Sequence, residues 1–247
     1  MRSDERQTNC DSLALRLNAV RARIASAARR SGRDPDDVDL IAVSKTRPAE
    51  KVLEAMDAGQ CVFGENRLQE ARAKMDAVAT ATSSSAPAPE WHLIGHLQTN
   101  KARDAVGRFA LIHSVDSVRL VAELERRAAA REVTQAILLQ VNVSGETSKF
   151  GVTPEALGAL LDAVDAAPHL RAEGLMTIPP FSSDPEAARP YFARLHDLWA
   201  DVADHPARVG RHLSMGMSGD FEVAVEEGAT LVRVGTALFG PRTVPAT

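Results

Sequence analysis

Apolar residues along the chain follow two spacings, one typical of amphipathic helices and one typical of buried strands. Within residues 11–31, apolar side chains recur every three or four positions, at Leu13, Leu17, Val20, Ile24 and Ala27. This spacing predicts a helix, with Asp11 or Ser12 suited to cap its start and Gly32 suited to end it. The next run, residues 38–43, is too short for a helix and does not alternate after Asp39. Such a run is typical of a parallel strand buried on both faces.

The same strand-then-helix unit recurs along the rest of the chain. Short apolar runs begin near Leu40, Val62, His92, Leu111, Ile137, Ala172, His212 and Leu231. Segments with helical periodicity separate these runs, so the sequence predicts a single-domain α/β protein, a (β/α)8 TIM barrel over residues 1–247. The alternative is an open doubly wound sheet, but the glycine-rich turn typical of dinucleotide-binding sheets does not follow the first run. Residues 79–89 (ATATSSSAPAP) lack large apolar groups, and we expect a loop without chemistry there.

Charge and cysteine content exclude several classes of protein. The chain has 29 basic and 33 acidic residues and a net charge of −4, which argues against nucleic-acid binding by bulk attraction. Its two cysteines, Cys10 and Cys61, cannot form a disulfide framework or a C-x-x-C metal motif. Neither a signal-peptide pattern nor a run of about 18 apolar residues is present. We therefore expect a cytoplasmic protein that binds neither nucleic acid nor membranes.

Lysine is scarce in this chain, which makes its positions informative. The lysines are Lys45, Lys51, Lys74, Lys101 and Lys149. Arginine can replace lysine at most solvated positions but does not lose its proton. Lys45 ends the first predicted strand, at the end where barrel enzymes carry their active sites. An amine there, with apolar walls and nearby cations, would have a lowered pKa and could attack a carbonyl. The alternative is a rim lysine in solvent.

The next two strand ends carry polar side chains whose roles remain open. Asn66 follows the second strand and offers both a donor and an acceptor at the barrel mouth, but Glu65 or Asn66 could equally cap the next helix. His92 and His96 are four residues apart, but Gly95 separates a strand from a loop between them. They therefore share no helix face, and we do not expect a metal site.

The last two strands end in residues suited to binding a phosphate. Ser218 follows the seventh strand and is suited to cap the helix after it, while Gly235 and Thr236 lie between the eighth strand and a short helix. In barrels these loops often bind phosphate, because helix starts expose free N–H groups. Two ordinary glycine-bearing caps are the alternative. Arg233 lies within the eighth strand between apolar neighbours, so an inward-facing guanidinium must be ion-paired or bound to a ligand.

A lysine ending the first strand and Arg-x-Gly-Thr after the eighth together resemble the fold-type III pyridoxal-phosphate proteins. From Leu13 to Arg242 the chain resembles more narrowly the pyridoxal phosphate homeostasis protein family. The motifs are AVSKTRP (42–48), FGENRLQEA (63–71), WHLIGHLQTNK (91–101), IHSVDS (112–117), VNVSGETSKFG (141–151), GLMTIPP (174–180), LSMGMSGDFEVAVEEG (213–228) and VRVGTALFG (232–240).

The resemblance implies a barrel like the N-terminal domain of alanine racemase, with pyridoxal 5'-phosphate on Lys45 as an internal aldimine. It also implies that Asn66 lies near the coenzyme ring and that Arg233 faces the pyridine nitrogen. The groups holding the phosphate would be Ser218, Gly235 and Thr236. The family is described as binding and buffering the coenzyme without established catalytic turnover, so we expect a carrier that supplies apo-enzymes. A permanently charged arginine keeps the ring nitrogen unprotonated and makes the ring a poor electron sink.

Two enzymatic alternatives remain. A pyridoxal-phosphate-dependent amino-acid racemase would share the barrel and the arginine. Alanine racemases add a β domain with a catalytic tyrosine across a dimer, whereas this chain ends at Thr247 and has one tyrosine, Tyr191, in the predicted helix after the sixth strand. We therefore expect a monomer without racemase activity. A Schiff-base aldolase that uses Lys45 without the coenzyme is the other alternative.

Overall fold

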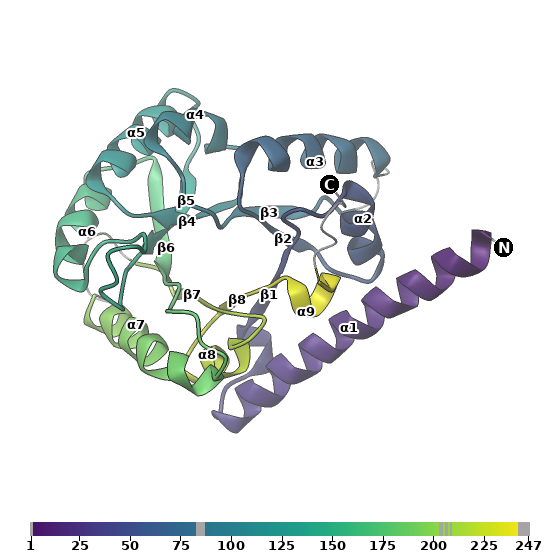
Figure 1. Ribbon diagram of the computed structural model, residues 1–247. Coiled ribbons are helices and arrows are strands. Elements are labelled where there is room, and N and C mark those ends of the chain that lie inside the picture. The colour runs from purple at the N-terminus through teal and green to yellow at the C-terminus, as the bar shows by residue number, and fades with distance from the viewer. Residues whose placement is uncertain (1, 83–86, 203–204, 206, 208, 242–247) are drawn as a thin grey trace.

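A computed structural model describes residues 2–82, 87–202, 205, 207 and 209–241 of the chain. Within these residues, parallel strands pair in chain order and β8 returns to pair with β1, so the sheet closes into a barrel (Figure 1). The strands are β1 (Asp39–Val43), β2 (Val62–Glu65), β3 (Glu90–Leu93), β4 (Leu111–Val115), β5 (Gln135–Gln140), β6 (Leu170–Met176), β7 (His212–Met217) and β8 (Leu231–Val234). The predicted (β/α)8 barrel is confirmed, and each strand begins within two residues of its predicted start.

Helices surround the ring of strands (Figure 1). They are α1 (Arg2–Arg30), α2 (Ala49–Asp57), α3 (Leu68–Ala81), α4 (Ala102–Ala105), α5 (Val118–Ala129), α6 (Leu157–Asp165), α7 (Arg189–Asp201), α8 (Phe221–Glu226) and α9 (Thr236–Phe239). Short 3-10 helices are η1 (Pro35–Asp37), η2 (Thr99–Lys101), η3 (Pro154–Ala156) and η4 (Pro185–Ala188). Among the described residues, no helix has both the length and the apolar content needed to span a membrane.

Two helix boundaries differ from the predictions. The first helix was expected to begin at Asp11 or Ser12, but α1 already begins at Arg2, and its N-terminal end projects beyond the ring (Figure 1). The apolar spacing begins at Leu13, which is fully buried, and the sequence before it lacks that spacing. The expected end is confirmed, since Gly32 has a φ of 71° and Arg33 N–H donates to the Ala28 carbonyl at 2.8 Å.

The expected loop at 79–89 begins later than predicted. Helix α3 continues to Ala81 because alanine favours helices and Val78 anchors the last turn in the core. Residues 83–86 lie outside the described residues.

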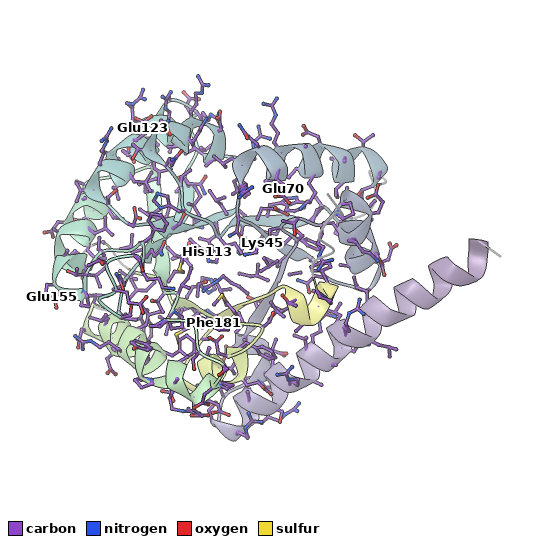
Figure 2. The ribbon with its side chains drawn as sticks, viewed as in Figure 1. Lys45, Glu70, His113, Glu123, Glu155 and Phe181 are labelled. Atoms are coloured by element: carbon purple, nitrogen blue, oxygen red, sulfur yellow. The ribbon has the colours of Figure 1, made fainter. Side chains whose placement is uncertain are left out.

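The apolar core has two layers, and the inner one shows which side chains of the strands face the barrel interior. A large apolar cluster fills the space between strands and helices, and a smaller one lies inside the barrel. The interior cluster contains Ile41, Leu111, Ala136, Leu138, Met176 and Leu231. Because side chains alternate along a strand, the inward-facing Ile41 places Val43 on the same face. Lys45 follows at the end of β1, and Figure 2 shows it near the centre of the ring.

Candidate functional site

The ends of β7 and β8 meet at the Ser218 hydroxyl. Ser218 Oγ accepts hydrogen bonds from Gly235 N–H at 3.2 Å and from Ala237 N–H at 3.3 Å. The expectation that Ser218 caps the helix after the seventh strand is therefore wrong. Residue Asp220 precedes α8, and its carboxylate accepts from Met217 N–H instead. The Ser218 hydroxyl faces α9 because β7 pairs with β8. This pairing cannot be read from the local sequence around Ser218.

The end of β8 also lies against the end of β1. A Cβ atom at Gly235 would lie 3.4 Å from both the Cβ and the carbonyl oxygen of Val43. Glycine at this position thus permits a close approach of the two backbones, two residues before Lys45. Thr236 is exposed at the start of α9, and Gly235 and Ser218 are half-buried. The predicted phosphate-binding residues and the predicted nucleophile therefore lie around one end of the barrel.

Arg233 is a buried cation in the barrel interior. It is 4 % exposed and donates to Ser214 Oγ at 2.5 Å and to the Thr177 carbonyl at 2.9 Å. Within the described residues no carboxylate lies within ion-pair distance of it, so the structure does not support a direct structural ion pair. Burial lowers the pKa of Arg233 to about 10, and the charge of Asp220 opposes this shift. The guanidinium therefore stays charged at neutral pH.

The turn that carries Lys45 is held on both sides by carboxylates. The interpretation of Glu65 as a cap of the next helix is wrong, because its carboxylate accepts from Ser44 and Lys74. Glu70 was not predicted. Before Lys45, Ser44 Oγ donates to Glu65 Oε1 at 2.6 Å. After it, Thr46 N–H donates to Glu70 Oε1. Thr46 has a φ of 61°, a left-handed conformation that a β-branched residue rarely adopts and that surrounding contacts must enforce. The backbone on both sides of Lys45 is thus fixed to β2 and α3.

Lys74 connects these two carboxylates. Its ammonium is buried and donates to the Ser44 carbonyl at 2.6 Å, to Glu65 Oε1 at 2.5 Å and to Glu70 Oε1 at 3.2 Å. The three contacts match its three N–H donors. Burial raises the pKa of Glu65, although the hydrogen bond from Lys74 opposes the shift.

A sequence signal for Lys74 was available. Lys74 lies three residues after Ala71 and four before Val78, both on the buried face of α3. A lysine at such a position, in a chain that otherwise uses arginine, indicates a buried amine with partners.

Asn66 follows β2 and is partly buried, but it does not cap a helix. Arg67 is the residue preceding α3, and it makes no side-chain cap either. The side-chain Oδ1 of Asn66 is buried and has no hydrogen-bond partner among the described residues. Asn66 also lines a surface pocket of about 360 Å³ with His96 and Lys101. An unpartnered buried amide oxygen of this kind is the feature expected where a ligand donor would bind.

His92 and His96 contact different partners. This agrees with the expectation that the two histidines do not share a helix face. His92 contacts His113 inside the barrel. His96 stacks on Phe150, with ring centroids 3.7 Å apart, and lies 3.4 Å from the Asp116 carboxylate. The loop after β5 therefore reaches the loop after β3 at the barrel mouth.

Comparison with known proteins assigns the chain to a family. Residues 15–243 match the sequence model of the family described as alanine racemase, N-terminal domain. A pyridoxal phosphate homeostasis protein of Aquifex aeolicus is 44 % identical over 227 residues, which cover 92 % of this chain and 97 % of that protein. The homologue of the same name from Pseudomonas aeruginosa is 46 % identical over 231 residues, covering 93 % and 96 %.

Solved structures agree with this relationship. PipY of Synechococcus elongatus PCC7942, solved with PLP bound, has a TM-score of 0.79 and 38 % identity, covering 92 % of this chain and all of PipY. An alanine racemase of Clostridium difficile 630 has a TM-score of 0.67 at 15 % identity, covering 95 % of this chain and 58 % of the racemase, and this likeness shows the fold alone. The chain therefore belongs to the pyridoxal phosphate homeostasis protein family, whose fold is the barrel of the alanine racemase N-terminal domain.

Proposed function

We propose that this protein binds pyridoxal phosphate at the C-terminal mouth of its barrel, covalently through Lys45, and takes part in pyridoxal phosphate homeostasis. The observation that carries the proposal is the meeting of three strand ends. Ser218 contacts the backbone at Gly235, and Gly235 lies against Val43, two residues before the lysine. The naming of the relatives and the PLP-bound structure of PipY support the same conclusion.

The donor set of the mouth fits the coenzyme. Pyridoxal phosphate supplies an aldehyde that condenses with a primary amine, an aromatic ring with a basic nitrogen, and a phosphate dianion that needs hydrogen-bond donors. The hydroxyls of Ser218 and Thr236 and the backbone at Gly235 would hold the phosphate. Arg233 would face the ring nitrogen, and the unpartnered Oδ1 of Asn66 would accept a hydrogen bond near the ring.

The clamp formed by Glu65, Glu70 and Lys74 would set the direction of the Lys45 side chain. Lysine has four rotatable bonds, so its amine loses much freedom when it reacts with a fixed partner. Fixing the backbone on both sides of the lysine reduces that loss in advance.

Two features support holding the coenzyme rather than catalytic turnover. Arg233 stays protonated at neutral pH, so it can donate to the ring nitrogen but cannot protonate it, and an unprotonated ring stabilises a carbanion poorly. The one tyrosine of the sequence, Tyr191, belongs to α7 in the outer helical layer. The exposure of Thr236 leaves the phosphate end at the open rim, which suits release to apo-enzymes by a monomeric carrier.

Replacing the lysine tests the covalent attachment. We expect Lys45→Ala to abolish the visible absorption band that appears when pyridoxal phosphate is added, with the fold intact by circular dichroism. Lys51→Ala, which removes another amine six residues away, should retain the band. Borohydride reduction of the wild type followed by peptide mapping should place the label on the peptide that contains Lys45. A normal band in Lys45→Ala would refute the assignment.

The Thr236 hydroxyl is expected to contribute to phosphate binding. Thr236→Ala should raise the Kd for pyridoxal phosphate about tenfold, because one hydrogen bond to a charged group contributes about 1.5 kcal/mol. The absorption band should survive, since backbone donors and Lys45 remain. Spectroscopic titration measures both quantities, and an unchanged Kd would contradict a phosphate role for this hydroxyl.

The buried ammonium of Lys74 should stabilise the fold. Lys74→Met leaves Glu65 buried without its partner, which costs about 3–5 kcal/mol of unfolding free energy. Lys101→Met removes an exposed lysine and should change the free energy by less than about 1 kcal/mol. Urea denaturation compares the two variants. Removing the carboxylate as well, in Glu65→Leu/Lys74→Met, should recover part of the lost unfolding free energy. If Lys74→Met and Lys101→Met lowered the unfolding free energy equally, the clamp would contribute nothing to stability.

The absence of turnover can be measured directly. Coenzyme-loaded protein incubated in D2O with a panel of amino acids should exchange their α-protons no faster than free pyridoxal phosphate does, because the ring is a poor electron sink. Mass spectrometry of the amino acids gives the rate. Exchange above that background, lost in Lys45→Ala, would favour the racemase-like alternative.

A further inference from the structure

A line of polar side chains crosses the barrel interior, where barrels are usually filled by apolar residues. It begins at the half-exposed carboxylate of Glu90 and ends at Arg233, and its three middle members are almost fully buried. The contacts are Glu90 Oε1 to His92 Nε2 at 2.8 Å, His92 Nδ1 to His113 Nε2 at 3.0 Å, His113 Nδ1 to Ser214 Oγ at 2.8 Å, and Ser214 Oγ to Arg233 Nη1 at 2.5 Å. We call these five residues the interior chain.

The interior chain draws on four strands and spans the barrel. Glu90 and His92 belong to β3, His113 to β4, Ser214 to β7 and Arg233 to β8. Glu90 is the first residue of its strand, so its carboxylate lies at the end opposite the mouth, and Figure 2 shows His113 near the centre of the ring. The chain therefore connects solvent at the N-terminal end of the barrel to the arginine of the coenzyme site.

The two ends of the chain fix the direction of every hydrogen bond in it. A carboxylate only accepts, so His92 carries its proton on Nε2, and its Nδ1 must accept from His113 Nε2–H. In neutral His113 this leaves Nδ1 as an acceptor, to which the Ser214 hydroxyl donates. A guanidinium only donates, so Arg233 donates to the remaining lone pair of Ser214 Oγ. Each member then has one suitable partner on each side.

Other protonation patterns fit less well. A proton on Nδ1 of His113 would leave the Ser214 hydroxyl hydrogen with no acceptor among the described residues. A second proton on either ring would add a buried positive charge close to Arg233. Burial, aided by the charge of Arg233, lowers the pKa of His113 well below its usual value, and the hydrogen bond from His92 lowers the pKa of Glu90. The first shift agrees with a neutral His113 ring, and the second agrees with an ionised Glu90 carboxylate.

The interior chain connects the buried guanidinium of Arg233 to a carboxylate, although among the described residues no carboxylate lies within ion-pair distance of it. This connection adds to the more distant charge of Asp220. Hydrogen bonds that all run in one direction polarise one another, so part of the negative charge of Glu90 acts at Arg233 through neutral groups. A direct ion pair would turn the guanidinium toward the carboxylate. In the interior chain, Nη1 of Arg233 donates to Ser214 Oγ, while the Thr177 carbonyl oxygen accepts a hydrogen bond from Nη2.

We propose that His92, His113 and Ser214 are positioning residues that orient Arg233 and couple its environment to Glu90 at the opposite end of the barrel. Their effect on the coenzyme rests on the proposed function, in which Arg233 faces the ring. The orientation of Arg233 itself does not depend on that function and can be measured in the ligand-free protein.

The test uses nitrogen-15 NMR on the full-length, ligand-free protein. In the wild type, Nε2 of both His92 and His113 should be protonated and Nδ1 of both unprotonated at neutral pH. Glu90→Gln keeps the size and an acceptor oxygen but removes the charge, so it should shift the Arg233 Nε–H resonance and mix the tautomers of His92. Asp39→Asn is the matched control, because it removes an exposed carboxylate from the first residue of β1, at the same end of the barrel.

The outcomes separate this inference from the proposed function. The interior chain is overturned if Nδ1 of either histidine is protonated. It is also overturned if Glu90→Gln moves the Arg233 signal no more than Asp39→Asn does. His113→Asn should also shift the Arg233 signal, and Glu90→Gln suffices if that variant does not fold, since Glu90 is half exposed. With pyridoxal phosphate added, Glu90→Gln should shift the absorption maximum and Asp39→Asn should not. A shifted Arg233 signal with no visible band in any variant would support the chain and refute the proposed function.

Discussion

The pairing of the first strand with the last is the constraint on which the site depends. Asp39 to Ala42 of β1 align with Leu231 to Val234 of β8, so the barrel closes between the two ends of the sequence. This register places Gly235, one of the proposed phosphate-binding residues, against Val43, two residues before Lys45. Sequence-distant groups meet here because parallel strands present all their carboxyl ends at one rim.

Two buried cations are stabilised in different ways, and the difference matches their positions. Lys74 extends from the buried face of α3 toward the sheet and contacts two carboxylates directly, which locks the turn around Lys45. Arg233 lies inside the barrel and reaches its nearest hydrogen-bonded carboxylate only through a serine and two histidines. A direct ion pair gives rigidity and uses up the donors of the cation, whereas a neutral bridge fixes the cation and leaves its charge active toward a ligand.

Local patterns in the sequence were sufficient for the barrel and for much of the site. Buried parallel strands are continuous apolar runs, so their number, order and starts follow from the sequence. The general rule that barrel sites lie at strand ends led to Lys45, Asn66, Ser218, Gly235 and Thr236, although their binding roles remain proposals. The predicted start of α1 was wrong because the helix extends beyond the apolar stripe from which it was predicted.

Partners that lie across the barrel could not be read from the sequence. Ser218 contacts α9 instead of capping its own helix, since that depends on the pairing of β7 with β8. His113 was not singled out because nothing near it in the sequence indicates that His92 and Ser214 lie on either side of it. Only the closed barrel brings β3, β4 and β7 together across the interior.

The same contacts favour a site that retains its ligand but can release it. The lysine side of the mouth is rigid, since a buried ion cluster holds the backbone on both sides of Lys45. The phosphate side is more open, with Thr236 exposed and Ser218 half-buried. In the proposed complex, a covalent bond to Lys45 would slow loss of the ligand, and an accessible phosphate would allow water or a partner protein to compete for it. Because Arg233 cannot protonate the ring, the proposed site combines retention and release without the electron withdrawal that amino-acid chemistry requires.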